Sequence, residues 1–207
     1  MENINVYDVH AKHYDKWFDD HHNWYMSEVT AIKKAIPENA RGIEVGIGSG
    51  RFAKALGIAE GIEPSESMAA LGRERGLSIK IGVVEALPYP DGSIDFVLMV
   101  TVDCFLNDLA KAFQEIYRVL KSGGKLIIGM IDKSSPLGIL YETKKKDNIF
   151  YCNATFHDVD EMTNELRKAN FHQFNYWQTL LNISQENYEE PQQGYGKGGF
   201  AVISAVK

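Results

Sequence analysis

The stretch Gly42-Ile-Glu-Val-Gly-Ile-Gly-Ser-Gly-Arg51 decides the fold of this chain, because it places four glycines within ten residues. Glycine at this density predicts a backbone that bends tightly or lets a ligand come very close. Residues 43–46 have the apolar character of a strand, and residues 51–56 form a helical pattern that Gly57 ends. A strand, a glycine loop and a helix in this order predict a ligand site at the carboxyl edge of a parallel sheet.

Beyond this loop, strand patterns alternate with helical patterns along the chain. The alternation predicts a parallel α/β sheet with right-handed crossovers. A turn-rich loop separates the last two strands, which predicts that they pair as an antiparallel hairpin. Strands are expected at 43–46, 59–63, 77–84, 94–102, 125–131, 171–181 and 200–206, and helices at 51–56, 65–75, 109–120 and 158–169.

Two segments stand outside this alternation. Residues 7–36 mix apolar and charged positions at helical spacing before Pro37, so residues 1–37 are expected to form one or two leading helices that cap the site. Residues 132–155 interrupt the rhythm and predict a long irregular insertion, which is often a lid or a substrate loop. The length suggests one domain, residues 1–207.

The composition excludes several classes of protein. The net charge of −6 argues against a nucleic-acid or membrane partner, since both need basic surface. Two cysteines without CxxC spacing and no apolar stretch of ~20 residues predict a cytoplasmic protein. Four of the six histidines lie in the first 22 residues beside Asp19 and Asp20, but a polar helix face explains them more simply than a metal site. We therefore expect no metal, and the oligomeric state stays open.

The spacing of the loop glycines distinguishes between ligands. Gly46, Gly48 and Gly50 form G-x-G-x-G, one residue more compact than the dinucleotide fingerprint, and the lysine of a Walker loop is absent from the sequence here. Glu44 would repel a pyrophosphate and attract a cationic group. Glu63 ends the second expected strand, where a carboxylate can accept both hydroxyl protons of a ribose. A cationic nucleoside without phosphate points to S-adenosylmethionine.

Four ordered stretches carry a family resemblance: Glu44-Val-Gly-Ile-Gly-Ser-Gly-Arg51, Gly61-Ile-Glu-Pro-Ser65, Glu85-Ala-Leu-Pro-Tyr-Pro-Asp-Gly-Ser-Ile-Asp95 and Arg118-Val-Leu-Lys-Ser-Gly-Gly-Lys-Leu126. In order and spacing they resemble the class I S-adenosylmethionine-dependent methyltransferases, in particular their type 11 group. The last stretch has Ser122 where the family has proline. The resemblance implies an α/β, Rossmann-like sheet of seven strands, mostly parallel with an antiparallel last strand, and helices on both faces.

The resemblance also implies a set of cofactor-binding residues. Glu44 would lie near the amino acid end of S-adenosylmethionine, Glu63 would hold the ribose hydroxyls, and Glu85 or backbone groups would recognise adenine because the usual acid is Val83 here. The full implied set is Tyr14, Glu44, Gly46, Gly48, Ser49, Gly50, Glu63, Pro64, Met68, Val84, Glu85, Ala86, Leu87, Thr101 and Val102.

The methyl acceptor is less defined by the sequence. Asp103, just past the fourth expected strand, is the ionisable residue best placed to act as a general base or to grip an amine, and a plain loop aspartate is the alternative. An Asn-Pro-Pro-Tyr motif does not follow that strand, which argues against methylation of a nucleic-acid base. Aromatic residues could build a pocket for a small organic or cationic acceptor, namely Tyr7, Tyr14, Trp17, Trp24, Phe150 and Tyr151.

The sequence therefore predicts a methyltransferase that acts on a small-molecule acceptor such as an amine. Two alternatives from other classes remain open at this stage. One is a nicotinamide-dependent oxidoreductase, and the other is a protein that binds S-adenosylmethionine without catalysis.

Overall fold

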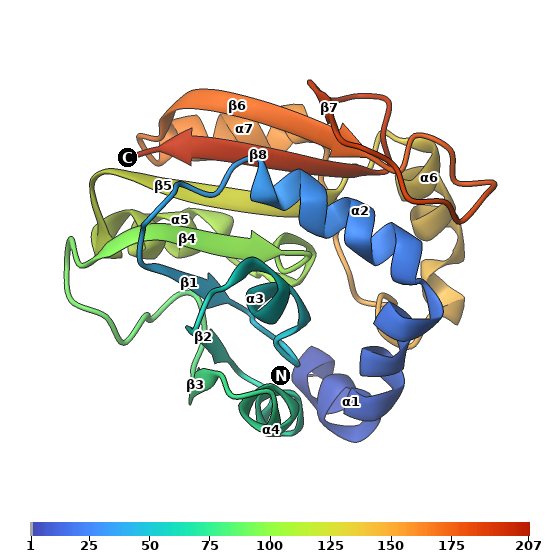
Figure 1. Ribbon diagram of the computed structural model, residues 1–207, viewed down its shortest axis with the longest axis horizontal. Helices are drawn as coiled ribbons and strands as arrows, with labels where there is room; N and C mark the ends of the chain where they lie inside the picture. Colours follow the sequence, from blue (N-terminus) through green and yellow to red (C-terminus); the bar gives the residue numbers. More distant parts are fainter. Residues whose placement is uncertain (1) are drawn as a thin grey trace.

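A single mixed sheet forms the centre of the protein, in a computed structural model that describes residues 2–207, with side chains from residue 5 onward. The strand order is β3-β2-β1-β4-β5-β8-β6-β7 (Figure 1). The strands are β1 Gly42–Val45, β2 Glu60–Glu63, β3 Ser78–Ile81, β4 Ile94–Val100, β5 Leu120–Ile131, β6 His172–Thr179, β7 Gln192–Gln193 and β8 Phe200–Val206.

The directions of the strands agree with the predicted fold class. β1 pairs in parallel with β2 and β4, and β2–β3 and β4–β5 are parallel as well. β8 runs antiparallel between β5 and β6, which confirms the antiparallel last strand and the closing hairpin. The two-residue strand β7 adds an eighth strand, which was not predicted because Gln192–Gln193 is too short and polar to give a strand pattern.

Two predicted strand ends differ from the structure by three residues or more, and the others differ by two residues at most. β3 ends at Ile81 instead of residue 84, because its partner strand β2 ends at Glu63. Glu63 and Ile81 form the last residue pair between the two strands. β5 begins at Leu120 instead of residue 125, because Leu120 pairs with Ile94 before the register shifts at the glycines that follow. The backbone released after β3 becomes available to line the ligand-binding edge of the sheet.

Helices cover both faces of the sheet (Figure 1). One apolar cluster joins the sheet to α2, α3 and α6, and the other joins it to α5 and α7. The α-helices are α1 Glu2–Asp20, α2 His22–Lys33, α3 Arg51–Leu56, α4 Glu66–Glu74, α5 Leu109–Val119, α6 Pro136–Lys144 and α7 Val159–Lys168, and short 3-10 helices are η1 Asp103–Phe105 and η2 Lys145–Asp147. Within residues 2–207, each helix is too short or too polar to cross a bilayer.

Of the two segments outside the alternation, the leading one is helical as predicted, and the insertion is more helical than predicted. The leading segment forms two helices, and α1 has a kink at His10, where φ is −114° and ψ is 21°. The insertion at 132–155 is not wholly irregular, because it contains α6 and η2. Ser135 caps α6 by accepting the N–H of Gly138, and Pro136 occupies the first turn, where a missing N–H costs nothing.

Candidate active site

A cavity of about 530 Å³ lies at the carboxyl ends of β1, β2 and β4. This is the edge toward which β1 and β4 point in Figure 1, and α1 lies beside it. The volume suits a ligand of nucleoside size. The wall of this larger cavity includes most of the expected cofactor residues, namely Tyr14, Gly46, Gly48, Glu63, Pro64, Met68, Val84, Glu85, Thr101 and Val102.

The glycine loop forms one wall because side chains do not fit there. Gly46 has φ +65°, and a Cβ at this position would lie 2.3 Å from Cγ2 of Val102. Gly48 has φ +56°, and its Cβ would lie 3.3 Å from Cε of Met68. Left-handed backbone and close neighbours together require glycine, so that main-chain atoms face the cavity directly.

Glu63 links the end of β2 to this loop. Its Oε2 accepts the N–H of Gly48 at 2.8 Å, and its Oε1 accepts the N–H of Ser65 at 3.0 Å. Burial raises the pKa of Glu63 to about 7, while these two N–H groups oppose the shift. Each carboxylate oxygen keeps a second lone pair for a ligand in the cavity.

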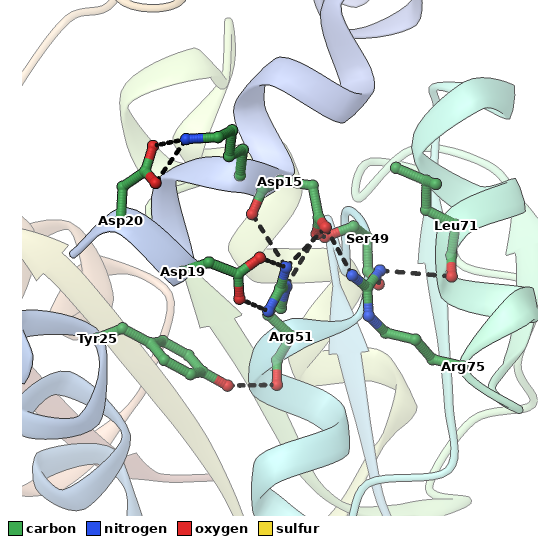
Figure 2. A network of polar contacts seen from close by, with 9 residues as sticks. Asp15, Asp19, Asp20, Tyr25, Ser49, Arg51, Leu71 and Arg75 are labelled. Carbon is green, nitrogen blue, oxygen red and sulfur yellow. Dashed lines mark hydrogen bonds and ion pairs between the residues drawn. The ribbon is translucent and has the colours of Figure 1, made fainter. Parts of the chain in front are cut away.

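Helix α1 is fixed against the loop by a polar network that centres on Asp15 (Figure 2). The Asp15 carboxylate accepts the hydroxyl of Ser49 at 2.5 Å and pairs with Arg51 at 2.8 Å and Arg75 at 2.6 Å. Nearer the start of α1, Asp8 accepts the Ser65 hydroxyl at 2.6 Å. These bonds hold α1 across the ligand-binding edge and place Tyr14 on the cavity wall.

A smaller cavity of about 120 Å³ adjoins the larger one. Its wall comes from α1, α2, α6 and the loop after η2, and it is dominated by aromatic rings. Five of the six aromatic residues proposed for an acceptor pocket line it, and Tyr7 lines the larger cavity instead. The five are Tyr14, Trp17, Trp24, Phe150 and Tyr151.

Tyr14 and Thr101 line both cavities, which therefore meet at these two residues. Burial raises the pKa of Tyr14 far above its ordinary value, so its hydroxyl keeps its proton and can donate a hydrogen bond. Thr101 has φ +50°, a conformation that β-branched residues rarely adopt. Strained backbone of this kind concentrates at functional sites, and here it stands at the boundary between two cavities.

The comparisons with known proteins agree on a family. A family model of a methyltransferase domain matches residues 43–128. An uncharacterized protein of Methanocaldococcus jannaschii is 42% identical over 205 residues, which cover 99% of this chain and 100% of that protein. A SAM-dependent methyltransferase of Thermotoga maritima, described as a possible histamine N-methyltransferase, matches with a TM-score of 0.95 and 43% identity, covering 98% of this chain and 99% of that one.

The chain belongs to the S-adenosylmethionine-dependent methyltransferases. A C-methyltransferase of ubiquinone and menaquinone biosynthesis from Geobacter sulfurreducens is more distant, with 29% identity over 136 residues that cover 58% of this chain and 51% of that one. The cofactor of the methyltransferase is S-adenosylmethionine. The larger cavity fits this group, because it combines a glycine wall without side chains with a carboxylate whose free lone pairs suit a ribose diol.

Glu44 does not line either cavity of the methyltransferase, contrary to its expected place near the amino acid end of the cofactor. Ile43 and Val45 belong to the cluster under α5 and α7, so strand alternation turns Glu44 to the opposite face, beneath α3. Its side chain is 2% exposed, and burial raises its pKa well above the ordinary value, which the N–H of Ala53 partly opposes. Burial therefore favours the neutral form of this carboxyl.

Four other implied cofactor residues also lie off the cavity walls. Ser49 turns its hydroxyl to Asp15. Gly50 serves packing, because a Cβ there would lie 2.2 Å from Cδ1 of Leu77. Leu87 is buried in the apolar core beneath α5, directly after Ala86, so the two do not reach the adenine side as expected.

Asp103 is not placed to act on an acceptor. It lies in η1 with 2% of its surface exposed and lines neither cavity. Burial raises its pKa to about 7, and backbone N–H groups of Asp103 and Cys104 oppose the shift. The chain turns into a 3-10 helix shortly after β4 and takes the carboxyl under the surface, so Asp103 does not lie at the open edge of the sheet where the sequence analysis expected it.

Glu28 is a residue that the sequence analysis missed. It lies on α2, is 7% exposed and lines the smaller cavity. Tyr25, Glu28, Val29 and Ile32 form one buried stripe at helical spacing, so a charged residue on an apolar helix face was the available signal. Burial raises the pKa of Glu28 to about 8.

The histidine-rich start of the chain does not assemble a metal site. Among the described residues, no group of three or more His, Cys, Asp or Glu side chains is arranged to hold a metal ion. His21 instead bonds Glu186 at 2.8 Å, and His13 lines the smaller cavity with its ring against Phe150. Phe105, Leu106, Asn107 and Asn153 complete the larger cavity and were not predicted, because their loops give no motif.

Proposed function

We propose that this methyltransferase transfers a methyl group from S-adenosylmethionine to a small-molecule amine, with the donor in the larger cavity and the acceptor in the smaller one. The observation that carries the proposal is the meeting of the two cavities at Tyr14 and Thr101. Methyl transfer is an in-line displacement, so a donor site and an acceptor site must share a boundary where the reacting atoms approach.

The protein's part in the reaction is positional. S-adenosylmethionine, when bound, supplies a methyl group on a positively charged sulfur. Glu63 holds the ribose hydroxyls, and the wall at Gly46 and Gly48 lets the ligand approach the main chain. Tyr14 and Thr101 then fix the direction in which an acceptor nitrogen meets the methyl carbon, and the surrounding aromatic rings exclude water from that path.

The character of the smaller cavity supports an amine. Aromatic faces attract cations, and eight aromatic side chains of the described part of the chain line this space together with the carboxylate of Glu28. The lining residues of this cavity include neither lysine nor arginine within the described chain, so an anionic acceptor would find no partner there. The Thermotoga maritima relative is described as a possible histamine N-methyltransferase, and histamine is an amine.

A screen of acceptors tests this proposal. The purified protein is incubated with S-adenosylmethionine and a panel of small amines, alcohols, thiols and carboxylates, and S-adenosylhomocysteine is measured by mass spectrometry. We expect product only with amines. A calorimetric titration with S-adenosylmethionine beside one with NADH serves as the control for the donor. Tight binding of the donor without product from any amine would contradict the proposal.

A further inference from the structure

The carboxylate of Glu28 is isolated within an aromatic environment. Its pKa is raised by burial alone, and no charge or hydrogen bond from the described residues offsets the shift. An unpaired carboxylate in a dry interior is costly, so such groups are normally paired or hydrogen-bonded. Glu28 nevertheless borders the smaller cavity, where a ligand can reach it.

Among the described residues, no hydrogen bond or charge stabilises the Glu28 carboxylate. Four other titratable side chains line this cavity: His13 and Tyr14 from α1, Tyr141 from α6 and Tyr151 from the loop after η2. Burial raises the pKa of both Tyr141 and Tyr151, so the two phenols stay neutral. Glu28 is thus the one carboxylate among the described lining residues of this cavity.

The cavity also limits the size of its ligand. Its volume of about 120 Å³ is close to that of an engineered apolar cavity of ~150 Å³ that accepts benzene. A ligand that reaches Glu28 and still lies beside Thr101 must therefore be compact. Rings from Trp17 and Trp24 line the same space and favour a positively charged group beside them.

We propose that Glu28 selects the methyl acceptor by pairing with the ammonium group of a compact primary or secondary amine. The proposal rests on the assignment of the smaller cavity to the acceptor. An ammonium with N–H donors satisfies the carboxylate by a charge-assisted hydrogen bond, which a neutral alcohol or a quaternary ammonium cannot provide in full. Before the transfer one ammonium proton passes to the Glu28 carboxylate, so that the nitrogen lone pair can attack the methyl carbon while the bond from that carbon to the donor sulfur breaks and S-adenosylhomocysteine leaves. Glu28 thereby acts as the residue that distinguishes amines from hydroxyl compounds of the same shape.

Binding measurements test the proposal without turnover. Three probes of similar size are titrated by calorimetry and by the fluorescence of Trp17 and Trp24: n-butylammonium, 1-butanol and tetramethylammonium. We expect the wild-type protein to bind n-butylammonium roughly tenfold to a hundredfold more tightly than 1-butanol. In Glu28→Gln this preference falls to about threefold or less, because the amide keeps the shape and loses the charge.

Asp103→Asn is the matched control. Asp103 is buried like Glu28 and has a raised pKa, but it lines neither cavity. We expect this variant to keep the full preference for n-butylammonium. Equal preference in the wild-type protein and in Glu28→Gln, or an equal loss in both variants, would overturn the proposal.

Proton release gives a second readout that uses only the wild-type protein. At about pH 7 the unpaired Glu28 is mostly protonated and must ionise when it pairs with an ammonium, so about one proton is released per amine bound. Calorimetry in two buffers with different ionisation enthalpies measures this number. We expect about one proton for n-butylammonium and none for 1-butanol. Binding of n-butylammonium without proton release would overturn the proposal even if Glu28→Gln fails to fold.

These outcomes separate the two proposals. Selective, proton-linked binding of n-butylammonium with no methyl transfer to any amine would support the role of Glu28 and contradict the proposed function. Methyl transfer to an amine that is equally fast in Glu28→Gln would support the proposed function and overturn the role of Glu28.

Discussion

The two cavities of this methyltransferase are built in opposite ways. The larger one is bounded by the ends of β1, β2 and β4 and by a glycine loop, so main-chain atoms form part of its wall beside the carboxylates of Glu63 and Glu85. The smaller one is bounded by side chains from α1, α2, α6 and the loop that follows. The glycine loop of the larger cavity tolerates few substitutions, so this cavity suits one ligand. The side chains of the smaller cavity can be replaced to suit another acceptor while the fold stays the same.

The largest effect is expected from a side chain in the backbone wall. Gly46→Ala places a Cβ 2.3 Å from Val102 at a φ of +65°, so the loop must move away from its ligand. We expect the affinity for S-adenosylmethionine to fall by about 100-fold, measured by calorimetry. Gly57→Ala is the matched control, because Gly57 has φ +75° with nothing within 4 Å of the added Cβ. Similar losses in both variants would show that backbone strain, and not the clash, sets donor affinity.

Glu28, in the wall of the smaller cavity, should make the stability of the protein depend on pH. The folded state raises the pKa of Glu28 to about 8 from the ordinary 4.5, so the folded protein binds a proton that the unfolded chain has lost. The free energy of unfolding therefore falls as the pH rises between these two values, and Glu28→Gln removes this share. We expect the variant to be more stable than the wild type by about 5 kcal/mol above pH 8 and equally stable below pH 4, measured by urea unfolding. Parallel curves for both proteins would contradict this.

Asp15 connects α1 to the glycine loop, and its replacement should weaken this connection. Although burial acts in the other direction, bonds from Arg51, Ser49 and Arg75 lower the pKa of Asp15 to about 2, so its contribution to stability is lost only as the pH falls from about 4 through 2. We expect Asp15→Asn to weaken donor binding about tenfold, because α1 no longer holds the loop.

Asp20→Asn is the control for that experiment. Asp20 lies on the same helix but pairs only with the exposed Lys16. Its replacement should change stability by less than about 0.5 kcal/mol and leave donor affinity unchanged. If the two variants behaved alike in calorimetry and urea unfolding, the network in Figure 2 would have no role in donor binding.

The smallest effect is expected at Asp103. Because this buried carboxyl lines neither cavity, Asp103→Asn should leave the Michaelis constants for donor and acceptor within about twofold of the wild type. Steady-state kinetics with an amine from the screen measures this. A loss of turnover with unchanged folding would restore Asp103 as a participant in the reaction.

The same difference between the two cavities explains which parts of the site could be predicted from the sequence. The sequence predicted part of the wall of the larger cavity, from the spacing of Gly46 and Gly48 and from the position of Glu63 at a strand end. This was possible because residues that are close together in the chain build this part. Glu44 was misplaced because strand alternation, and not proximity in the sequence, decides which face a side chain occupies. Asp103 was misplaced because a 3-10 turn follows β4 directly.

Glu28 could not be assigned from the sequence for a different reason. Its cavity depends on how α1, α2 and α6 cross, and these crossings arise from packing between segments that are far apart in the chain. The sequence identified the aromatic residues as a group by their type, but it did not show that they lie around Glu28. Only the folded arrangement shows that they surround one carboxylate.

Tyr14 should couple the binding of the donor to the binding of the acceptor. Because one ring forms part of both walls, any ligand that fixes its position on one side also prepares the surface on the other. The donor should then raise the affinity for the acceptor, and the acceptor must raise the affinity for the donor by the same factor.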